Sequence, residues 1–369
     1  MGKYNHKAIM LIITENCNLK CRYCYEHDKT KNDMTFETAK EIIDKEFGNQ
    51  SEYTKGEIEL FGGEAFLNFK LIKQIYDYVM NNFPNVDFIF TNTTNGTLIC
   101  GEIQKWLYER RNKFFCTLSL DGTPEMHDMN RPYANNKGSF DSIDLDFFRN
   151  TWNNCGVKMT VSNDTIDNLS DGVKFISSKG FDCMATFASG IDWSIKCKKD
   201  KIAEEFSKLV DYYTENQDMK LCHMLNYDLR YIFYPINKDF KYCGAGIIKK
   251  CYDIHGKGYP CQGLSPLSIG EDAKNFEGQN FEGFELSDSN KCKKCKWVRL
   301  CRTCYAANYL ETGNIEQNCE DMCYLNRVSI LACSKIQFNR LLQKDAELTE
   351  NDRLTLHAIQ IIQEEILLL

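Results

Sequence analysis

The cysteines are the residues of this chain whose types and spacing most clearly indicate chemistry. Cys17, Cys21 and Cys24 are separated by three residues and then by two, directly after a short apolar segment. Three thiolates on one loop can hold a cubane iron–sulfur cluster, which normally takes four. With no fourth cysteine nearby in the sequence, one iron would stay open to bind a small chelating molecule. Zinc is the alternative, although zinc favours four ligands in paired CxxC spacings.

This spacing, with the aromatic Tyr23 just before the third cysteine, resembles the signature of the radical S-adenosylmethionine (SAM) superfamily. The resemblance implies that the open iron binds the amino and carboxylate groups of SAM. Reductive cleavage of SAM then yields a 5′-deoxyadenosyl radical that abstracts a substrate hydrogen. Tyr23 is expected near the adenine.

A second motif, Gly62-Gly63-Glu64, resembles the family's GGE motif, which holds the SAM amino group. Glycines allow the backbone to approach a ligand closely. Ala65 follows where the family commonly has Pro, which is a departure from the family pattern in this loop.

Polar residues near the ends of predicted strands complete the expected SAM site. Asn95 follows the third strand, and Ser119 and Asp121 end the fourth. Parallel barrels place their sites at this end. Ser162, at the end of the fifth strand, is a further candidate for which an ordinary polar turn is the alternative.

The segment from Asp121 to Arg131 resembles one found in peptide-modifying members of the superfamily. His127 and Arg131 lie in it. They either contact substrate or satisfy their hydrogen bonds within the protein. No residue is predicted from the sequence as a catalytic acid or base.

A second cysteine group lies toward the carboxyl end, where ten of the 19 cysteines fall between Cys243 and Cys333. The pattern reads Cys243-x12-Gly256-x4-Cys261, then Cys292-x2-Cys295-x5-Cys301-x2-Cys304, then Cys319 and Cys323. It resembles the SPASM domain, which carries two auxiliary four-iron clusters in peptide- and protein-modifying radical SAM enzymes. The last internal spacing is two residues where the better-known pattern has three. A zinc ribbon is the alternative.

The resemblance implies two ligand sets and therefore three [4Fe-4S] clusters in all. The first auxiliary cluster takes Cys243, Cys261 and Cys304, with Cys251 favoured as the fourth ligand. The second takes Cys292, Cys295, Cys301 and either Cys319 or Cys323. Cys323 is favoured because an apolar helix is predicted over 324–332. The remaining cysteines are expected in the core or on the surface: Cys100, Cys116, Cys155, Cys183, Cys197, Cys222 and Cys333.

The elements that must position these residues alternate between strand and helix over the first 215 residues. Short segments rich in β-branched and aromatic residues predict strands over 8–13, 57–61, 86–91, 114–120, 157–162 and 183–187. Helical periodicity predicts helices over 35–47, 69–82, 101–111, 139–154, 169–178 and 201–214. Such β-then-α units indicate an α/β fold with a parallel sheet, either an open barrel or a doubly wound sheet. The family resemblance favours a partial (β/α)6 TIM-like barrel.

The expected domains are the barrel over 1–215, a linker over 216–239, the SPASM domain over 240–335 and a helical segment over 336–369. An amphipathic helix is predicted from about residue 345 to the end, packed on the core, with dimerisation as a minor alternative. Its apolar residues are Leu354, Ala358, Ile361, Ile362, Ile366 and Leu369.

Composition excludes several classes of protein. The net charge of −7, without a basic tract, disfavours a nucleic-acid partner. No export signal or membrane span is visible, so the cysteines favour metal binding over disulfides and a cytoplasmic location is expected.

The expected function is that of a peptide maturase that forms a thioether or carbon–carbon crosslink on a ribosomally made precursor. A formylglycine-forming enzyme of the anaerobic sulfatase-maturing type is the runner-up, and an iron–sulfur electron-transfer or scaffold protein is an alternative of another class. Expected partners are a peptide or protein substrate and an external reductant. Only about seven residues precede the first strand, so a leader-binding module is expected to be absent. The barrel surface or a separate protein would then bind the leader.

One residue separates the first two alternatives. In sulfatase-maturing relatives, the motif resembling Tyr259-Pro260-Cys261 is followed by an Asp held to be the catalytic base. Here Gln262 stands in that position. An amide cannot take up a proton at neutral pH, so formylglycine formation is expected to be poor.

Overall fold

A computed structural model describes residues 5–48, 53–153, 155–234 and 243–366. The chain divides into two compact units, the first formed by Met1–Lys158 and Cys243–Glu282, the second by Met159–Tyr242 and Gly283–Leu369. The predicted domain boundaries were placed where periodicity and composition change along the sequence. They stay a prediction. Within the described ranges, no helix is long and apolar enough to cross a membrane.

The six predicted strands are confirmed. They are β1 (His6–Thr14), β2 (Lys55–Gly62), β3 (Asp87–Thr94), β4 (Phe114–Ser119), β5 (Gly156–Val161) and β6 (Asp182–Phe187). Two short strands, β7 (Lys249–Tyr252) and β8 (Gly258–Tyr259), extend the sheet to the order β6-β5-β4-β3-β2-β1-β7-β8. The order from β1 to β6 never reverses, as it would in a doubly wound sheet, so that alternative is wrong. The sheet is the open, singly wound kind expected for a partial barrel.

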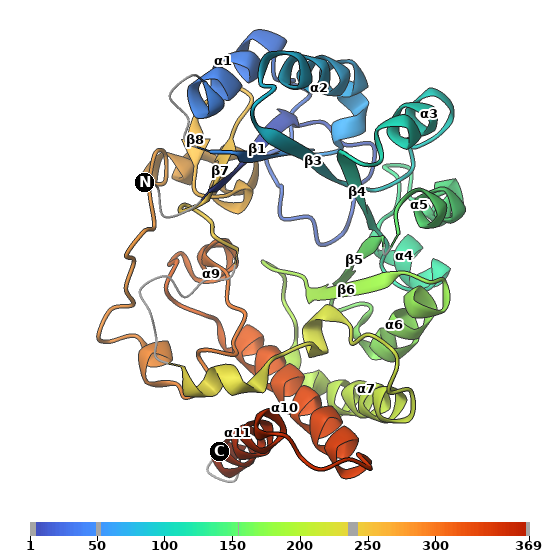
Figure 1. The fold of residues 1–369 in the computed structure, drawn as a ribbon, viewed down its shortest axis with the longest axis vertical. Helices are drawn as coiled ribbons and strands as arrows, with labels where there is room; N and C mark the ends of the chain where they lie inside the picture. The colour runs from blue at the N-terminus through green and yellow to red at the C-terminus, as the bar shows by residue number, and fades with distance from the viewer. Residues whose placement is uncertain (1–4, 49–52, 154, 235–242, 367–369) are drawn as a thin grey trace. The chain divides into compact units, whose positions relative to one another are not determined.

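Helices of the first unit lie on one side of this sheet. Figure 1 shows α1 (Phe36–Phe47), α2 (Phe69–Asn82) and α3 (Gly101–Arg110) on the same side of β1 to β4. Aromatic residues fill the space between the layers. The Phe90 and Phe114 rings stack at 6.0 Å, and Trp106 of α3 meets Phe114 edge-on at 5.3 Å. Burial of such rings is the main source of stability for this layer.

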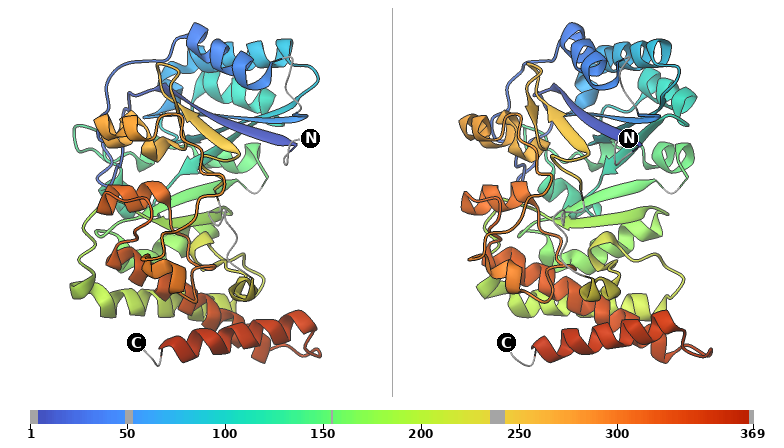
Figure 2. Two further views of the ribbon diagram at one scale, coloured as in Figure 1. Left: turned by 90° about the vertical axis from the view of Figure 1, so that its left-hand side faces the viewer. Right: turned by 60° about the vertical axis from the view of Figure 1, so that its left-hand side comes forward.

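The β7–β8 hairpin joins the sheet beside β1, as both views of Figure 2 show. β7 runs parallel to β1, with Ala8 opposite Lys249 and Met10 opposite Cys251. β8 returns antiparallel, with Tyr259 opposite Cys251. The beginning of the cysteine-rich region is therefore built onto the sheet of the first unit.

The predicted helix over 139–154 is corrected. The structure has a 3-10 turn at Phe140–Ser142 and a separate helix α5 (Leu145–Thr151). Asp144 starts α5 as its N-cap, accepting a hydrogen bond from the Phe147 amide at 3.0 Å. A further helix, α4 (Pro124–Asn130), was not predicted, although Thr123 and Pro124 form a regular N-cap and first position.

The second unit contains α6 (Leu169–Ser178), α7 (Ile195–Glu215), α10 (Glu320–Leu342) and α11 (Glu350–Ile366). α10 begins earlier than the predicted segment 324–332 because Cys319 caps it and two acidic residues occupy its first turn. It also continues across the predicted boundary at 335. Cys323 therefore lies inside this helix rather than before it.

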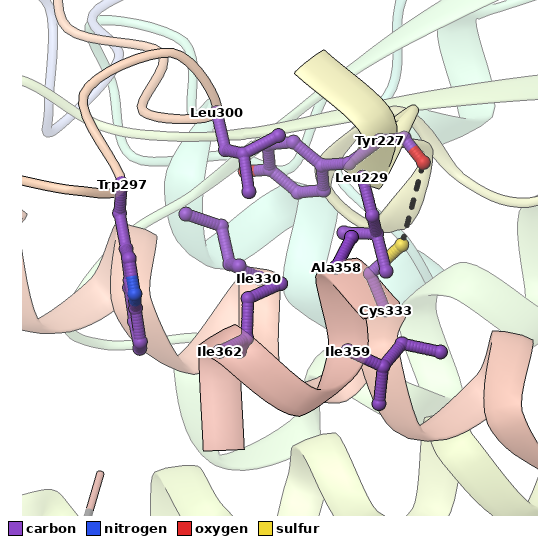
Figure 3. Close-up of a cluster of buried hydrophobic side chains, with 9 residues drawn as sticks. All are labelled: Tyr227, Leu229, Trp297, Leu300, Ile330, Cys333, Ala358, Ile359 and Ile362. Carbon is purple, nitrogen blue, oxygen red and sulfur yellow. Dashed lines mark hydrogen bonds between the residues drawn. The ribbon is translucent and has the colours of Figure 1, made fainter. Parts of the chain in front are cut away.

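The C-terminal helix packs on a core of the second unit, as predicted. Figure 3 shows this cluster, whose members are Tyr227, Leu229, Trp297, Leu300, Ile330, Cys333, Ala358, Ile359 and Ile362. Leu354 is corrected: it is 40% exposed because it lies off the buried face. Ile361 is half-buried, while the side chains of Ile366 and Leu369 lie outside the described part of the chain.

Candidate active site

The loop that carries Cys17, Cys21 and Cys24, here called the cluster loop (residues 15–33), leaves the end of β1. Its backbone is held by other parts of the first unit. The Lys20 amide donates to the Pro132 carbonyl at 2.8 Å, and the Arg22 amide to the Asn130 carbonyl at 2.9 Å. All three cysteines are free thiols of intermediate exposure. The loop thus presents its thiols from a backbone whose position is fixed by nonlocal hydrogen bonds.

Two cations point at these thiols. Lys29 Nζ lies 3.0 Å from the Cys24 sulfur, and Arg131 Nη1 lies 3.9 Å from the Cys21 sulfur. Burial raises the pKa of Cys17 to about 12 and also raises the pKa of Cys21, which Arg131 counteracts. The two cations oppose this effect of burial and favour the thiolate, which is the form that binds metal.

Ligands for a single ion must converge on one point, whereas cubane thiolates bind separate irons. The donor set of the cluster loop, three thiols with two compensating cations, fits an iron–sulfur cluster.

The glycines of the GGE motif lie against the start of the cluster loop. Gly62 has a φ of +148°, and a Cβ there would lie 2.0 Å from the Thr14 carbonyl oxygen. A Cβ on Gly63 would lie 2.3 Å from the carbonyl oxygen of Asn16. The amides of Gly63 and Glu64 donate to these two carbonyls at 3.1 and 2.8 Å. Only glycine allows this approach of the two backbones.

Glu64 is buried and its carboxylate is held firmly. One oxygen accepts from the Thr94 hydroxyl at 2.8 Å, and the other accepts from the Asn95 amide at 2.8 Å. Burial raises the pKa of Glu64, and these donors counteract the effect. The Asn95 side chain in turn donates to Asn18 of the cluster loop at 2.9 Å. The structure therefore brings Glu64 and Asn95 together beside the cysteines.

Asp121 is the centre of a buried network at the end of β4. It accepts from the Tyr23 hydroxyl at 2.6 Å, from Arg131 Nε at 2.9 Å and from the Asn130 side chain at 3.3 Å. The Arg131 guanidinium lies 5.4 Å from the centre of the Tyr23 ring, a cation–π distance. Tyr23 and Asp121, two of the predicted SAM contacts, are thus linked to each other and to the cluster loop.

His127 is fully buried and both of its ring nitrogens are engaged. The Asp121 amide donates to Nδ1 at 3.3 Å, and Nε2 lies 3.0 Å from the Ser139 hydroxyl. Burial lowers the pKa of His127 to about 4. The structure thus places His127 in a network that supports Asp121 and Arg131.

The two predicted serines have different surroundings. Ser119 is buried at the end of β4, opposite Lys158 of β5. Ser162 belongs to the second unit, where its carbonyl accepts from the Thr165 and Ile166 amides at 3.2 and 3.0 Å. Ser162 thus forms an ordinary polar turn, which was the alternative to a SAM contact. A contact between Ser162 and SAM stays a prediction.

Three of the predicted auxiliary ligands lie in the first unit. Cys251 is buried on β7, Cys261 lies two residues beyond the end of β8, and Cys243 is exposed. Burial, and then the neighbouring Cys261, raise the pKa of Cys251 well above its ordinary value. The hairpin therefore brings Cys251 and Cys261 near each other. Cys304 belongs to the second unit.

Three of the cysteines predicted for the second auxiliary cluster line a pocket of about 340 Å³ in the second unit, whereas Cys301 is not among its lining residues. Its lining includes Cys292, Cys295 and Cys323 together with the cationic Lys291 and Arg327. Cys319 faces elsewhere: its sulfur accepts the Met322 amide at 3.3 Å, and it lines a different pocket with Glu311. Burial raises the pKa of Cys319 to about 11. This geometry favours Cys323 over Cys319 as a ligand.

Several residues of the site were missed from the sequence. Lys29 and Glu26 flank Cys24, Thr94 holds Glu64, and Asn130 and Ser139 support Asp121 and His127. Thr94 adjoins the predicted Asn95 and could have been included on that ground. The others have no distinguishing spacing, since their partners lie far away in the sequence or across a turn.

Comparisons with known proteins agree with this geometry. A family model described as a 4Fe-4S single cluster domain matches residues 8–140, which include the cluster loop and Glu64. An uncharacterised protein of Methanocaldococcus jannaschii is 31% identical, covering 61% of this chain and 81% of that protein. A cysteine-type anaerobic sulfatase-maturating enzyme of Clostridium novyi is 26% identical, covering 80% of this chain and 87% of the relative.

Two further relatives extend the likeness across most of the chain. The radical SAM cyclopropyl synthase TigE of Paramaledivibacter caminithermalis is 24% identical over 88% of this chain and 73% of that enzyme. A solved structure of native anSMEcpe with bound AdoMet and Kp18Cys peptide superposes with a TM-score of 0.69 at 20% identity. It covers 92% of this chain and 98% of the other. The three-cysteine loop, the glycine–glutamate motif and these relatives together place the chain in the radical SAM superfamily, as an enzyme of the SPASM type.

Proposed function

We propose that this enzyme is a peptide maturase that uses SAM to form a thioether or carbon–carbon crosslink in a ribosomally made precursor peptide. The observation that carries the proposal is the combination of an intact SAM-cleaving site with Gln262 in place of an acid beside Cys261. A relative named as a sulfatase-maturating enzyme supports a protein or peptide substrate. The proposal also includes an external electron donor and a cytoplasmic location.

The residues of the first unit have defined parts in this proposal. Cys17, Cys21 and Cys24 hold a [4Fe-4S] cluster, which supplies the electron for reductive cleavage of SAM. Gly62, Gly63 and Glu64 bind the SAM amino group, since their backbones lie directly against the cluster loop. Tyr23, Asn95, Ser119 and Asp121 line the nucleoside side, with Ser162 as a further contact.

Two auxiliary clusters complete the proposal, held by Cys243, Cys251, Cys261 and Cys304 and by Cys292, Cys295, Cys301 and Cys323. The pocket lined by Cys292, Cys295 and Cys323 supports the second set. Anaerobically reconstituted protein should hold about twelve irons, four per cluster. An iron content near that of a single cluster, or stoichiometric zinc, would refute this assignment.

Cys251 decides the role of the first auxiliary cluster. Its position next to Cys261 on the hairpin supports ligation, which would make this cluster an electron relay rather than a site for a substrate thiolate. The variant Cys251→Ala should then lose iron and change the visible and EPR spectra. Unchanged iron and spectra would leave an open iron site and favour sulfur–carbon coupling at that cluster.

Formylglycine formation is the second candidate function, favoured by the likeness to a sulfatase-maturating enzyme. The residue environment argues against it. Gln262 cannot serve as the base, and its side chain is hydrogen-bonded to the half-buried Tyr25. Loss of a positioned base lowers a rate by a factor of about 10² to 10⁴.

The experiment that separates these candidates uses a sulfatase-type Cys peptide, incubated anaerobically with enzyme, SAM and reductant and then measured by mass spectrometry. We expect 5′-deoxyadenosine without appreciable aldehyde. Efficient aldehyde formation would favour formylglycine formation over crosslinking as the function. Absence of 5′-deoxyadenosine from iron-loaded enzyme would instead favour the electron-transfer or scaffold alternative. A leader-binding partner is tested afterwards, by adding candidate proteins to a precursor peptide.

A further inference from the structure

Lys29 is half-buried and lies between a carboxylate and a thiol of the cluster loop. Its Nζ is 3.0 Å from the Cys24 sulfur and 3.6 Å from an Oε2 of Glu26. The Lys29 side chain is 23% exposed and that of Glu26 only 7%. A lysine amine is charged at neutral pH, and here the ammonium faces a cluster ligand.

The cation at the neighbouring ligand is arranged differently. Arg131 faces the Cys21 sulfur at 3.9 Å, but its guanidinium is bound at 2.9 Å by the fully buried Asp121. Lys29 approaches its sulfur more closely than it approaches its carboxylate. Of these two cations, Lys29 therefore has the stronger direct interaction with a thiolate. Charge-assisted hydrogen bonds of this kind are stronger than neutral ones.

A charge beside a cluster ligand acts on electron transfer. Hydrogen bonds to the sulfurs and the net charge near a cluster are among the factors that set its reduction potential. Reduction adds one electron, supplied by an external low-potential one-electron donor, and makes the cluster with its thiolates more negative. A nearby ammonium stabilises the reduced state more than the oxidised one. Removing it should make the cluster harder to reduce.

We propose that Lys29 is a positioning residue that raises the reduction potential of the SAM-binding cluster by donating a hydrogen bond to Cys24, an effect that the Glu26 carboxylate opposes because it attracts the same ammonium. This inference rests on the proposed function, since it requires the cluster on Cys17, Cys21 and Cys24. It extends that proposal from the ligands to a residue with no ligand role. The Lys29 ammonium also compensates the negative charge of the buried Glu26 carboxylate, which lies close to a cluster that becomes more negative on reduction.

The test is a reductive titration followed by EPR on reconstituted full-length enzyme. The signal of this cluster is the one lost in the triple variant Cys17→Ala, Cys21→Ala, Cys24→Ala. In Lys29→Met, we expect the ratio of reduced to oxidised cluster at a fixed potential to fall about tenfold, which is about 59 mV for a one-electron couple. Lys29→Arg should retain most of the wild-type ratio. The matched control is Lys31→Met, which removes an exposed lysine of the same loop.

A second variant supplies a measurement if Lys29→Met fails to bind the cluster. Glu26→Gln frees the ammonium from its carboxylate and should raise the reduced fraction. An unchanged potential in Lys29→Met, or a shift equal to that of Lys31→Met, overturns the inference. If Lys29→Met does not load iron, an unchanged or lowered potential in Glu26→Gln overturns it. Failure of the proposed function would look different, because the wild type itself would then lack the EPR signal or the SAM cleavage.

Discussion

The two cysteine regions of this enzyme are built in different ways. The cluster loop is held by amide hydrogen bonds to Asn130 and Pro132 and lies against Gly63 and Glu64. The region around Cys292 and Cys295 has a single 3-10 turn, Lys291–Lys294, with little regular structure on either side. In the first region the protein itself positions the thiols. In the second, the proposed auxiliary cluster would supply much of that positioning.

The second region is still anchored at one point. Trp297 and Leu300 are buried in the core shown in Figure 3, where they meet Ile330 of α10 and Ile362 of α11. The anchor lies between the cysteine pairs and leaves Cys295 and Cys301 half-exposed on either side. We conclude that cluster loss should unfold the cysteine segments around this anchor, whereas it should leave the cluster loop folded.

The largest expected effect is therefore on the second region. Replacing both Cys292 and Cys295 by Ala should make residues 283–319 sensitive to protease and lower the stability of the second unit by about 5 kcal/mol, since metal binding contributes directly to folding in such regions. Replacing Cys17 and Cys21 should leave the cluster loop resistant. Limited proteolysis with mass spectrometry measures both. Equal cleavage of the two regions in both variants would contradict the proposed difference between a region held by metal and a region held by the protein.

A backbone substitution tests whether the protein holds the first region. Gly62→Ala combines a strained φ with a Cβ that would meet the Thr14 carbonyl, and should cost about 4 kcal/mol in unfolding free energy. Gly101→Ala is the matched control. Gly101 also has a positive φ, but open space surrounds its Cβ position, so its cost should be about 1 kcal/mol. Chemical denaturation gives both values, and similar costs would contradict the close approach.

The His127 network gives the first region a pH dependence. The folded pKa of His127 is about 4, below its unfolded value of 6.5, because of burial. A lowered His pKa means that the unfolded chain binds the proton first, so stability is full above pH 6.5 and falls as the pH drops toward 4. Between pH 7.5 and 5.5 this loss should be about 1 kcal/mol.

The comparison for that measurement is His127→Asn, which keeps an acceptor for the Asp121 amide and removes the titrating ring. Denaturation at the two pH values should show a smaller fall in this variant. The charged neighbours of His127 are Asp121, Arg131 and Asp128. An identical loss of stability between the two pH values in both proteins would mean that His127 does not cause the pH dependence.

The smallest effect distinguishes Cys319 from Cys323. Cys323→Ala should lose iron because this residue lines the pocket with Cys292 and Cys295. Cys319→Ala removes only the thiol cap of α10 and should cost about 0.5 kcal/mol with full iron content. Iron analysis with thermal unfolding tests the pair, and iron loss from Cys319→Ala instead would reverse the assignment.

Much of the fold was predictable because it depends on local patterns. The six strands are short runs of β-branched and aromatic residues, and each was found within a few residues of its true bounds. The helix predicted over 139–154 was too long because Asp144, read as an ordinary helical residue, is an N-cap that starts α5. Hydrophobic periodicity does not reveal such a break.

The site was predictable where spacing carries the information and not where contacts are nonlocal. The cysteine spacings and Gly62-Gly63-Glu64 could be recognised in the sequence. The contact of Arg131 with Cys21 joins residues 110 positions apart, and the turn that brings Lys29 to Cys24 has no sequence signature. The burial of Leu354 was predicted wrongly because an amphipathic helix shows which residues are apolar, but not how far its partner core extends.

The central claim is that the cluster loop, with its glycine–glutamate support, cleaves SAM. The most direct measurement is 5′-deoxyadenosine formed by reconstituted enzyme with SAM and dithionite under anaerobic conditions. It is compared with the triple variant Cys17→Ala, Cys21→Ala, Cys24→Ala, whose iron content should fall from about twelve to about eight. We predict multiple turnovers or a stoichiometric yield for the wild type and none for the variant. Equal product from both proteins, or no product from fully loaded wild type, would contradict the account.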